Sequence, residues 1–167
     1  ALLMSSARSV LRMHAASSLS PGEVLKKVNR ILYSDFPSAK FVTLVYAVID
    51  PSARTISFAN AGHLYPLSID SKGAEFLETF EGLPLGIMES EFTTRTIEMA
   101  QGSRLLLYTD GITEAANSGD EEYGAERVRE NMSRRSSSMQ GLLDSIQEFS
   151  AGTPATDDMT VVMISAF

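Results

Sequence analysis

The stretch FVTLVYAVI, residues 41–49, is a nearly continuous apolar run, rich in β-branched and aromatic side chains. Such a run predicts a β-strand that is buried on both faces. Residues 50–53 (DPSA) follow as a turn, and RTISFANAGH, residues 54–63, alternates as a returning strand. A connection this short makes the pair antiparallel. Because antiparallel sheets usually leave one face in water, burial on both faces predicts an α+β fold, an α-β-β-α sandwich of two antiparallel sheets flanked by helices.

Helices are predicted on both sides of this strand pair. Apolar residues recur at helical spacing over residues 2–15. The sequence Ser20-Pro21-Gly22-Glu23 has the form of a capping box and predicts a helix over 21–34. Later helices are predicted over 125–134 and 139–150, and later strands over 64–69, 75–77, 92–99, 104–109 and 160–167.

The composition bounds the class of protein. The 167 residues suit a single domain, and 44% hydrophobic residues predict a packed core. The absence of cysteine excludes disulfides, thiolate zinc sites and cysteine nucleophiles, and it favours a reducing, cytoplasmic location. A net charge of −7 disfavours nucleic acid as a partner. No apolar run approaches the ~18 residues of a membrane span.

Two acidic segments stand at the tips of predicted strands. LLLYTDGITEA, residues 105–115, ends an apolar strand in Asp110, and ATDDMTVVMI, residues 155–164, places Asp157 before one. Carboxylate oxygens are ligands that Mg²⁺, Mn²⁺ and Ca²⁺ accept, and a pair of such ions could activate a water and neutralise a phosphoryl group. The alternative is that these aspartates are ordinary turn residues, which is the commoner case for each motif alone.

Three other polar features have simpler explanations. Asn60-Ala61-Gly62-His63 ends a strand and could line a site, but a lone histidine at a strand end is more often a hydrogen-bonded structural residue. GLPLGI, residues 82–87, lacks the spacing of a phosphate-binding loop and is interpreted as a turn. Glu114 could be a carboxylate that supports a metal ligand, but it is interpreted as a solvated loop residue.

Taken in order, the motifs resemble a known family. FVTLVYAVIDP, ANAGH, GLPLG, LLLYTDGITEA, YGAERV and DDMTVV follow one another as in the SpoIIE/RsbU branch of the PPM, or protein phosphatase 2C-type, metal-dependent serine/threonine phosphatases. The resemblance covers nearly the whole chain. It implies the sandwich fold predicted above and a centre of two Mn²⁺ or Mg²⁺ ions. It also implies that Asp110 and Asp157 are catalytic metal ligands, that Asp158 is a further ligand of lower rank, and that Gly111 acts through its backbone beside the metal.

The resemblance also implies a reaction and partners. Water attacks phosphorus directly, without a phospho-enzyme intermediate. Family substrates are usually phosphoserine or phosphothreonine on anti-sigma-factor antagonists, and an N-terminal sensor or receiver domain usually commands the activity. The substrate-binding residues, the substrate protein, the input signal and the choice between Mn²⁺ and Mg²⁺ are not determined by the sequence, and a homodimer is left open.

The chain departs from the family pattern at its beginning. The helix matching ALLMSSAR is preceded in the family by a D-V-S-G-x-G-like motif that supplies a bridging carboxylate. We therefore expect residues 1–167 to be the C-terminal part of a single phosphatase domain, lacking its N-terminal strands and inactive on its own. The alternative is a pseudo-phosphatase, a catalytically inactive regulatory module that binds protein. A smaller departure is Gln101-Gly102-Ser103, which is expected to be a turn without catalytic effect.

Overall fold

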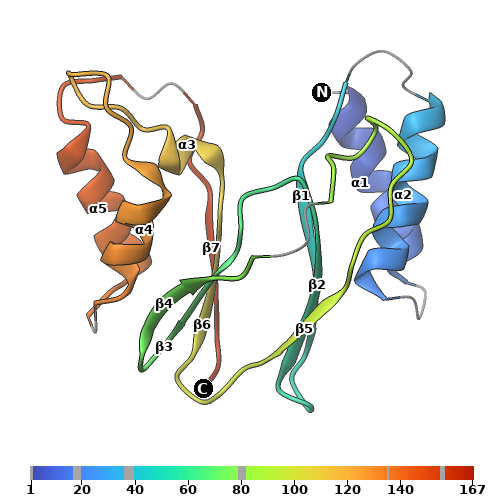
Figure 1. Cartoon of the computed structure of the whole chain (residues 1–167), viewed down its shortest axis with the longest axis horizontal. Coiled ribbons are helices and arrows are strands. Elements are labelled where there is room, and N and C mark those ends of the chain that lie inside the picture. Colours follow the sequence, from blue (N-terminus) through green and yellow to red (C-terminus); the bar gives the residue numbers. More distant parts are fainter. Residues whose placement is uncertain (1, 17–19, 36–39, 79–81, 135, 155–156) are drawn as a thin grey trace. The chain divides into compact units, whose positions relative to one another are not determined.

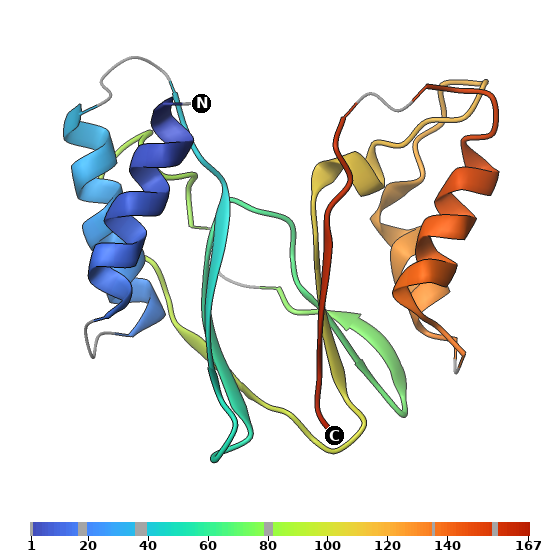
Figure 2. The ribbon, with the colours of Figure 1, turned by 180° about the vertical axis from the view of Figure 1, so that it is seen from behind.

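The structure is a computed structural model that describes residues 2–16, 20–35, 40–78, 82–134, 136–154 and 157–167. The chain forms two compact units: unit 1 comprises residues 1–63 and 79–99, and unit 2 comprises residues 64–78 and 100–167. Each unit has its own antiparallel sheet and its own helices (Figure 1, Figure 2). The predicted α+β class with two antiparallel sheets and helices is confirmed. That residues 1–167 form one domain stays a prediction.

Unit 1 places two helices against one face of a three-stranded sheet (Figure 1). The sheet has the strand order β1-β2-β5. The elements are α1 (Leu2–Ala15), α2 (Pro21–Asp35), β1 (Leu44–Asp50), β2 (Thr55–Ala61) and β5 (Arg95–Glu98). Buried side chains of α2 and β2 form the centre of its core, among them Val24, Leu25, Val28, Leu32, Ala59 and Ala61. Unit 1 therefore has a hydrophobic core of its own.

The predicted capping box at the start of α2 is present in part. The carboxylate of Glu23 accepts hydrogen bonds from the backbone N–H of Ser20 at 2.9 Å and from its hydroxyl at 2.7 Å. These bonds hold the pKa of Glu23 below its usual range, with the hydroxyl as the larger cause. The hydroxyl thus bonds the carboxylate and not a backbone N–H of the first turn. Pro21 is the first helical residue, as predicted.

Strand β1 differs from the prediction in its burial. The strand exists and pairs with β2 from Leu44 opposite Ala61 to Asp50 opposite Thr55. However, β1 is at the edge of its sheet, and Val48 and Ile49 are 42% and 50% exposed. The prediction of complete burial on both faces is therefore wrong. The α2 core reaches only as far as Leu44 and Tyr46 along this strand, which leaves the residues near the turn exposed.

Unit 2 places helices against a four-stranded sheet with the order β4-β3-β6-β7 (Figure 2). Its core joins strand residues such as Leu67, Leu106 and Tyr108 to Val128 and Met132 of α4 and Leu142 and Ile146 of α5. The elements are β3 (Leu67–Asp70), β4 (Gly73–Phe76), β6 (Arg104–Tyr108), α3 (Asp110–Thr113), α4 (Gly124–Met132), α5 (Met139–Phe149) and β7 (Val161–Ser165).

Most predicted elements of unit 2 are found within a few residues of the expected bounds. The hairpin β3–β4 turns across Asp70–Gly73, and Gly102 takes a φ of 79° in the turn that was predicted at residues 101–103. The sequence did not predict α3, a helix of four residues that begins at Asp110 itself. Asp110 therefore lies in the first turn of a short helix and not in a simple turn.

Candidate metal centre

Strand pairing brings the two acidic segments together. In unit 2, β6 and β7 run antiparallel with Tyr108 opposite Val161. The residues that follow β6 therefore lie beside the residues that precede β7 (Figure 1). These are the TDG segment, residues 109–111, and the DDMT segment, residues 157–160. The sheet register alone thus explains why residues nearly fifty positions apart in the chain become neighbours.

Thr109 fastens the two segments to each other. Its backbone N–H donates to the carbonyl of Thr160 at 3.1 Å. Its hydroxyl accepts from the backbone N–H of Thr160 at 3.0 Å and donates to the carbonyl of Asp158 at 3.3 Å. Three hydrogen bonds from one residue continue the β6–β7 ladder past the last strand pair. They fix the backbone at the start of α3 against the backbone of the DDMT segment.

Gly111 is required by how closely these segments pack. A Cβ atom at this position would lie 2.5 Å from the carbonyl oxygen of Asp158 and 3.5 Å from the carbonyl carbon of Asp157. Real Cβ atoms do not approach backbone oxygen so closely, so any other residue would displace the DDMT segment. Gly111 is buried and donates its N–H to Oδ1 of Asp110 at 3.0 Å. Gly111 therefore has a steric role, and its predicted role through its backbone beside a metal stays a prediction.

The three aspartates of the centre differ from the core around them in being exposed to solvent. Oδ1 of Asp157 accepts the backbone N–H of Asp158 at 2.7 Å, as Oδ1 of Asp110 does from Gly111. The carboxylates of Asp110 and Asp157 are thus each oriented by the next residue's N–H. Among the described residues, no hydrogen bond to Oδ2 of Asp110 or Asp157 is found. These oxygens can accept bonds from a cation or from water.

The donor set of Asp110, Asp157 and Asp158 suits a hard divalent cation, because Mg²⁺ and Mn²⁺ take carboxylate oxygen. Within the described ranges, however, no group of three or more Asp, Glu or His side chains is close enough to enclose an ion. The residues therefore fit one side of a metal site. Magnesium commonly keeps several waters and uses only one or two carboxylates, so a partial protein shell is compatible with it.

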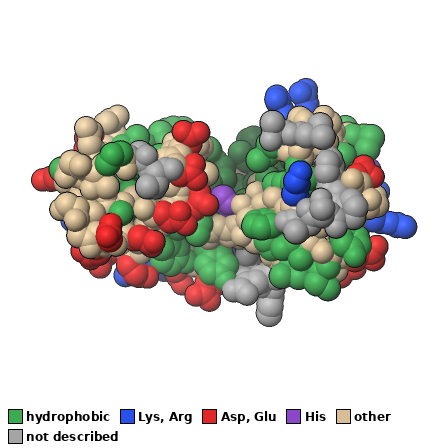
Figure 3. All heavy atoms as spheres, turned by 90° about the horizontal axis from the view of Figure 1, so that it is seen from above, with side chains coloured by type: hydrophobic (Ala, Val, Ile, Leu, Met, Phe, Trp, Pro, Cys, Tyr) green, Lys and Arg blue, Asp and Glu red, His purple; other side chains and the backbone are tan. Residues whose placement is uncertain are grey.

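Unit 2, to which this centre belongs, is rich in acidic residues. Unit 2 carries 14 Asp and Glu residues and 6 Lys and Arg residues, a net charge of −8, while unit 1 carries 7 and 8 for a net of +1. Figure 3 shows acidic side chains gathered on unit 2. The loop between α3 and α4 contributes Glu114, Asp120, Glu121 and Glu122. Arg127 pairs with Glu121 at 2.5 Å and lowers the pKa of that carboxyl, through a hydrogen bond first and its charge second.

The other conspicuous motifs serve structure in unit 1. The side chain of Asn60 accepts the N–H of His63 at 2.8 Å and donates to its carbonyl at 2.9 Å. Gly62 between them has a φ of 66°, and a Cβ there would lie 2.6 Å from the ring of Pro84. The ring of His63 contacts the hydroxyl of Thr43 at 3.2 Å. ANAGH and GLPLG are thus a turn and a loop packed on each other, as the structural interpretation predicted, and Glu114 is an exposed loop residue.

Two positioning residues were missed by sequence reasoning. The first is Thr109, for which the sequence predicted no role of its own, although a threonine next to an acidic strand tip is a candidate for such bridging. The second is Asn29 of α2, which is 1% exposed. Its side chain accepts the N–H of Gly86 and donates to the carbonyl of Met88, both at 2.8 Å. No local pattern reveals this contact, because its partners are 57 and 59 residues away.

Sequence comparison places the chain among known proteins. The whole chain, residues 1–167, matches the family model Stage II sporulation protein E (SpoIIE). Protein IcfG of a Synechocystis strain is 31% identical over 131 residues, which are 75% of this chain and 21% of that protein. Phosphoserine phosphatase RsbP of Bacillus subtilis is 32% identical over 117 residues, which are 67% of this chain and 29% of that protein. The chain spans less than a third of either relative's length.

Structural comparison agrees on the fold. The SiaA-PP2C domain of Pseudomonas aeruginosa matches with a TM-score of 0.83 at 18% sequence identity, over 98% of this chain and 68% of that one. At this identity the likeness shows the fold alone. In the part of the chain that the structure describes, none of the helices is both long and apolar enough to span a membrane.

Proposed function

The chain belongs to the SpoIIE family, and from this we propose that it is part of a metal-dependent phosphatase acting on phosphoserine or phosphothreonine of a regulatory protein in bacterial signalling. One observation supports this most: the β6–β7 register places Asp110 beside Asp157 and Asp158, with Gly111 allowing the close approach. The relative RsbP is described as a phosphoserine phosphatase.

The proposed roles come from the family motifs, and the geometry of unit 2 supports them. Asp110 and Asp157 would hold one or two Mn²⁺ or Mg²⁺ ions, Asp158 would add a further carboxylate, and Gly111 allows the two acidic segments to approach each other. When bound, such ions lower the pKa of water and neutralise charge on a phosphoryl group. Because the aspartates are exposed, a phosphorylated side chain can reach them from solvent. Thr109 keeps the two acidic segments in register through its three hydrogen bonds.

The substrate and the regulation are proposed by family likeness. A phosphorylated anti-sigma-factor antagonist is the proposed partner, and a sensor or receiver domain N-terminal to the phosphatase is the proposed source of control. A cytoplasmic location suits such a partner. The proposal rests on the SpoIIE match and on the RsbP relative, of which this chain covers 29%.

A pseudo-phosphatase is the second candidate, because the described residues lack a group of three acidic or histidine side chains close enough to hold an ion. Such a module would keep the fold and bind the partner protein without hydrolysing it. The two candidates differ in turnover and not in partner. A phosphatase releases inorganic phosphate from a phosphoserine peptide in the presence of Mn²⁺, and a pseudo-phosphatase does not.

The test is phosphate release by the full-length protein with Mn²⁺, comparing wild type with Asp110→Asn. This substitution removes a ligand charge and almost no volume, so we expect the rate to fall by two orders of magnitude or more while the melting temperature changes little. Glu114→Gln is the matched control, because Glu114 is an exposed acid four positions away and should keep the wild-type rate. Equal rates in wild type and Asp110→Asn would show that Asp110 has only a structural role. No release by wild type would favour the pseudo-phosphatase.

The 1–167 chain should be measured beside the full-length protein. We expect the shorter chain to be nearly inactive, because two or three carboxylates form only part of a two-ion site. Full activity of the 1–167 chain would show that it contains every ligand the reaction needs.

A further inference from the structure

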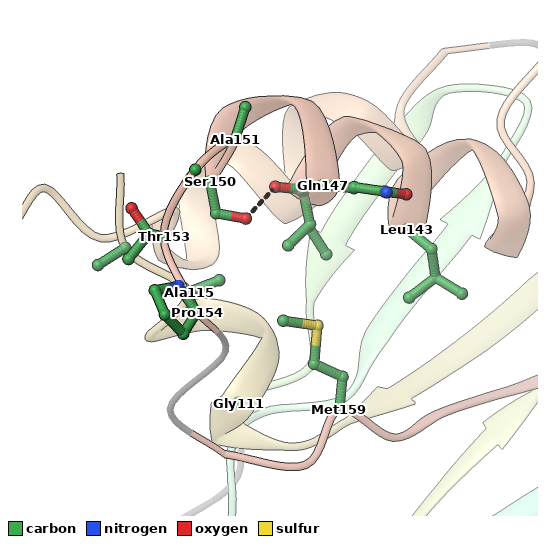
Figure 4. A pocket seen from close by; sticks show the side chains of 12 residues that line it. Gly111, Ala115, Leu143, Gln147, Ser150, Ala151, Thr153, Pro154 and Met159 are labelled. Atoms are coloured by element: carbon green, nitrogen blue, oxygen red, sulfur yellow. Dashed lines mark hydrogen bonds between the residues drawn. The ribbon is translucent and has the colours of Figure 1, made fainter. Parts of the chain in front are cut away.

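A cavity of about 650 Å³ lies in unit 2 beside the acidic centre (Figure 4). One wall is the helix α5 with Leu143, Ile146 and Gln147, and the residues that follow this helix continue the wall. Gly111 and Ala115 line it from α3 and the segment after it, and Met159 lines it from the DDMT segment. Its volume falls in the range of pockets that hold small ligands or side chains, about 300–1,000 Å³.

The cavity shares its backbone with the candidate metal centre. Gly111 follows Asp110 directly, and Met159 follows Asp158 directly. Gly111 also packs on the carbonyl of Asp158, so both segments form one floor. In Figure 4 the side chains of Met159 and Leu143 project into the space between α5 and this floor. A molecule bound at the aspartates would therefore have this cavity as its immediate neighbour.

The chemistry of the cavity contrasts with that of unit 2. None of its twelve lining residues is charged, although unit 2 as a whole carries a net charge of −8. Leucine, isoleucine, methionine, alanine and proline side chains provide most of the lining, with the polar groups of Gln147, Ser150 and Thr153 among them. The hydroxyl of Ser150 is already bonded to the carbonyl of Ile146 at 2.7 Å. An uncharged hollow of mixed lining, with more apolar than polar side chains, within an acidic unit suits an apolar side chain carried by a basic segment.

We infer that this cavity is a substrate subsite: it receives an apolar side chain of the phosphoprotein segment whose phosphorylated residue lies at Asp110 and Asp157. The inference rests on the proposed function and adds a specificity that nothing in the family match supplies. The preferred segment has a leucine, methionine or phenylalanine within a few residues of the phosphoserine. It also has lysine or arginine residues, which complement the acids of unit 2.

The experiment uses fluorescent peptides that carry a non-hydrolysable phosphonate analogue of phosphoserine, with flanking lysines and one leucine placed in turn at each position on either side of the analogue. A matched peptide has serine in place of that leucine. Binding to the full-length protein is measured by fluorescence anisotropy with Mn²⁺ present. At the best position we expect leucine to tighten binding about tenfold over serine, because one large apolar side chain leaves water.

Three variants on α5 test where the preference arises. Leu143→Gln removes an apolar side chain from the cavity wall and should abolish the preference for leucine. Gln147→Leu makes the wall more apolar and should increase the preference a few-fold. Met139→Gln is the control, because it makes the same kind of change on the same helix outside the cavity. It should leave the preference intact. The melting temperature of each variant is recorded, and binding is measured at a temperature at which all three variants are folded.

Hydrolysis of p-nitrophenyl phosphate, which has no peptide to fill the cavity, separates this inference from the proposed function. Turnover of this ester with equal binding of leucine and serine peptides would overturn the subsite and leave the phosphatase standing. A leucine preference that survives in Leu143→Gln would likewise overturn the subsite and leave the phosphatase standing. Preference for leucine that Leu143→Gln abolishes, without turnover of any ester, would support the cavity as a peptide site and overturn the phosphatase. Failure to bind any peptide would overturn the subsite.

Discussion

The two units of the chain use a similar construction for different purposes. Each packs helices on an antiparallel sheet, but unit 1 has a net charge of +1 and unit 2 a net charge of −8. In unit 1 the buried polar contacts close loops: Asn29 fixes the 86–88 segment, and Asn60 fixes the turn to His63. In unit 2 the polar contacts at the sheet end join the two segments that carry the exposed aspartates. The difference supports the proposal that the metal centre belongs to unit 2.

The largest expected effect tests unit 1 as a purely structural unit. Asn29→Leu leaves the N–H of Gly86 and the carbonyl of Met88 without the partners that they have now. We expect it to lower the free energy of unfolding by about 2–4 kcal/mol, because buried polar groups without partners cost about 1–3 kcal/mol each. Chemical denaturation measures this. If this variant weakens Mn²⁺ binding by as much free energy as it lowers stability, unit 1 is not purely structural.

Gly111→Ala tests the close approach in unit 2. The added Cβ forces the carbonyl of Asp158 away, so we expect about 1–3 kcal/mol of destabilisation and a loss of Mn²⁺ affinity. Gly119→Ala is the control, because a Cβ there meets only the side chain of Asn117, at 3.3 Å. Denaturation and a metal titration are run on both variants. Equal metal affinity in the two would show that the Gly111 contact does not set the geometry of the centre.

The buried Tyr108 of β6 makes the stability of unit 2 fall at alkaline pH. Burial, with a smaller contribution from the charge of Glu126, raises the pKa of Tyr108 to about 12. The folded state holds this proton more tightly than the unfolded chain, whose tyrosines titrate near 10. The stabilisation of the folded state that results is therefore complete below about pH 10. It is lost as the pH rises toward 12, by up to about 3 kcal/mol. Chemical denaturation between pH 9 and 12 measures how the free energy of unfolding depends on pH. Tyr108→Phe should make this dependence weaker, and an unchanged dependence would contradict the role given to Tyr108.

The smallest effect is expected at the bridge between the acidic segments. Thr109→Val keeps the shape but loses the hydroxyl bonds to Thr160 and Asp158. We expect about 1 kcal/mol of destabilisation, since the freed groups are near solvent. Thr109→Ser keeps the hydroxyl and should restore most of the Mn²⁺ affinity that the valine variant loses. If valine and serine behave alike, the hydroxyl does not position the aspartates.

The sequence predicted the fold well where periodicity carried the signal. The strands around FVTLVYAVI and LLLYTDG and the helices at 2–15 and 139–149 lie close to their expected bounds, because burial imposes the spacing of apolar residues. Exposure of Val48 and Ile49 was not foreseen, because a continuous apolar run does not reveal that its strand is at a sheet edge. The helix α3 was missed because four residues are too few to show a helical period.

The sequence predicted the acidic residues of the candidate site but not the residues that position them. Asp110 and Asp157 stand at strand tips, and the family motifs named them. That they are metal ligands stays a proposal. The roles of Thr109 and Asn29 depend on partners far away in the sequence, and the cavity beside Gly111 depends on how α5 packs. Such contacts leave no local pattern in a single sequence.

The most direct test of the central claim is Mn²⁺ binding by isothermal titration calorimetry, carried out on the full-length protein. The double variant Asp110→Asn with Asp157→Asn is compared with Asp120→Asn with Glu122→Gln, which removes the same charge from the exposed loop of unit 2. We predict that the first pair weakens Mn²⁺ binding by at least about tenfold, because it removes direct carboxylate ligands, while the second stays within about twofold of wild type. Equal weakening by both pairs, or none by the first, would contradict a metal centre at the β6–β7 end.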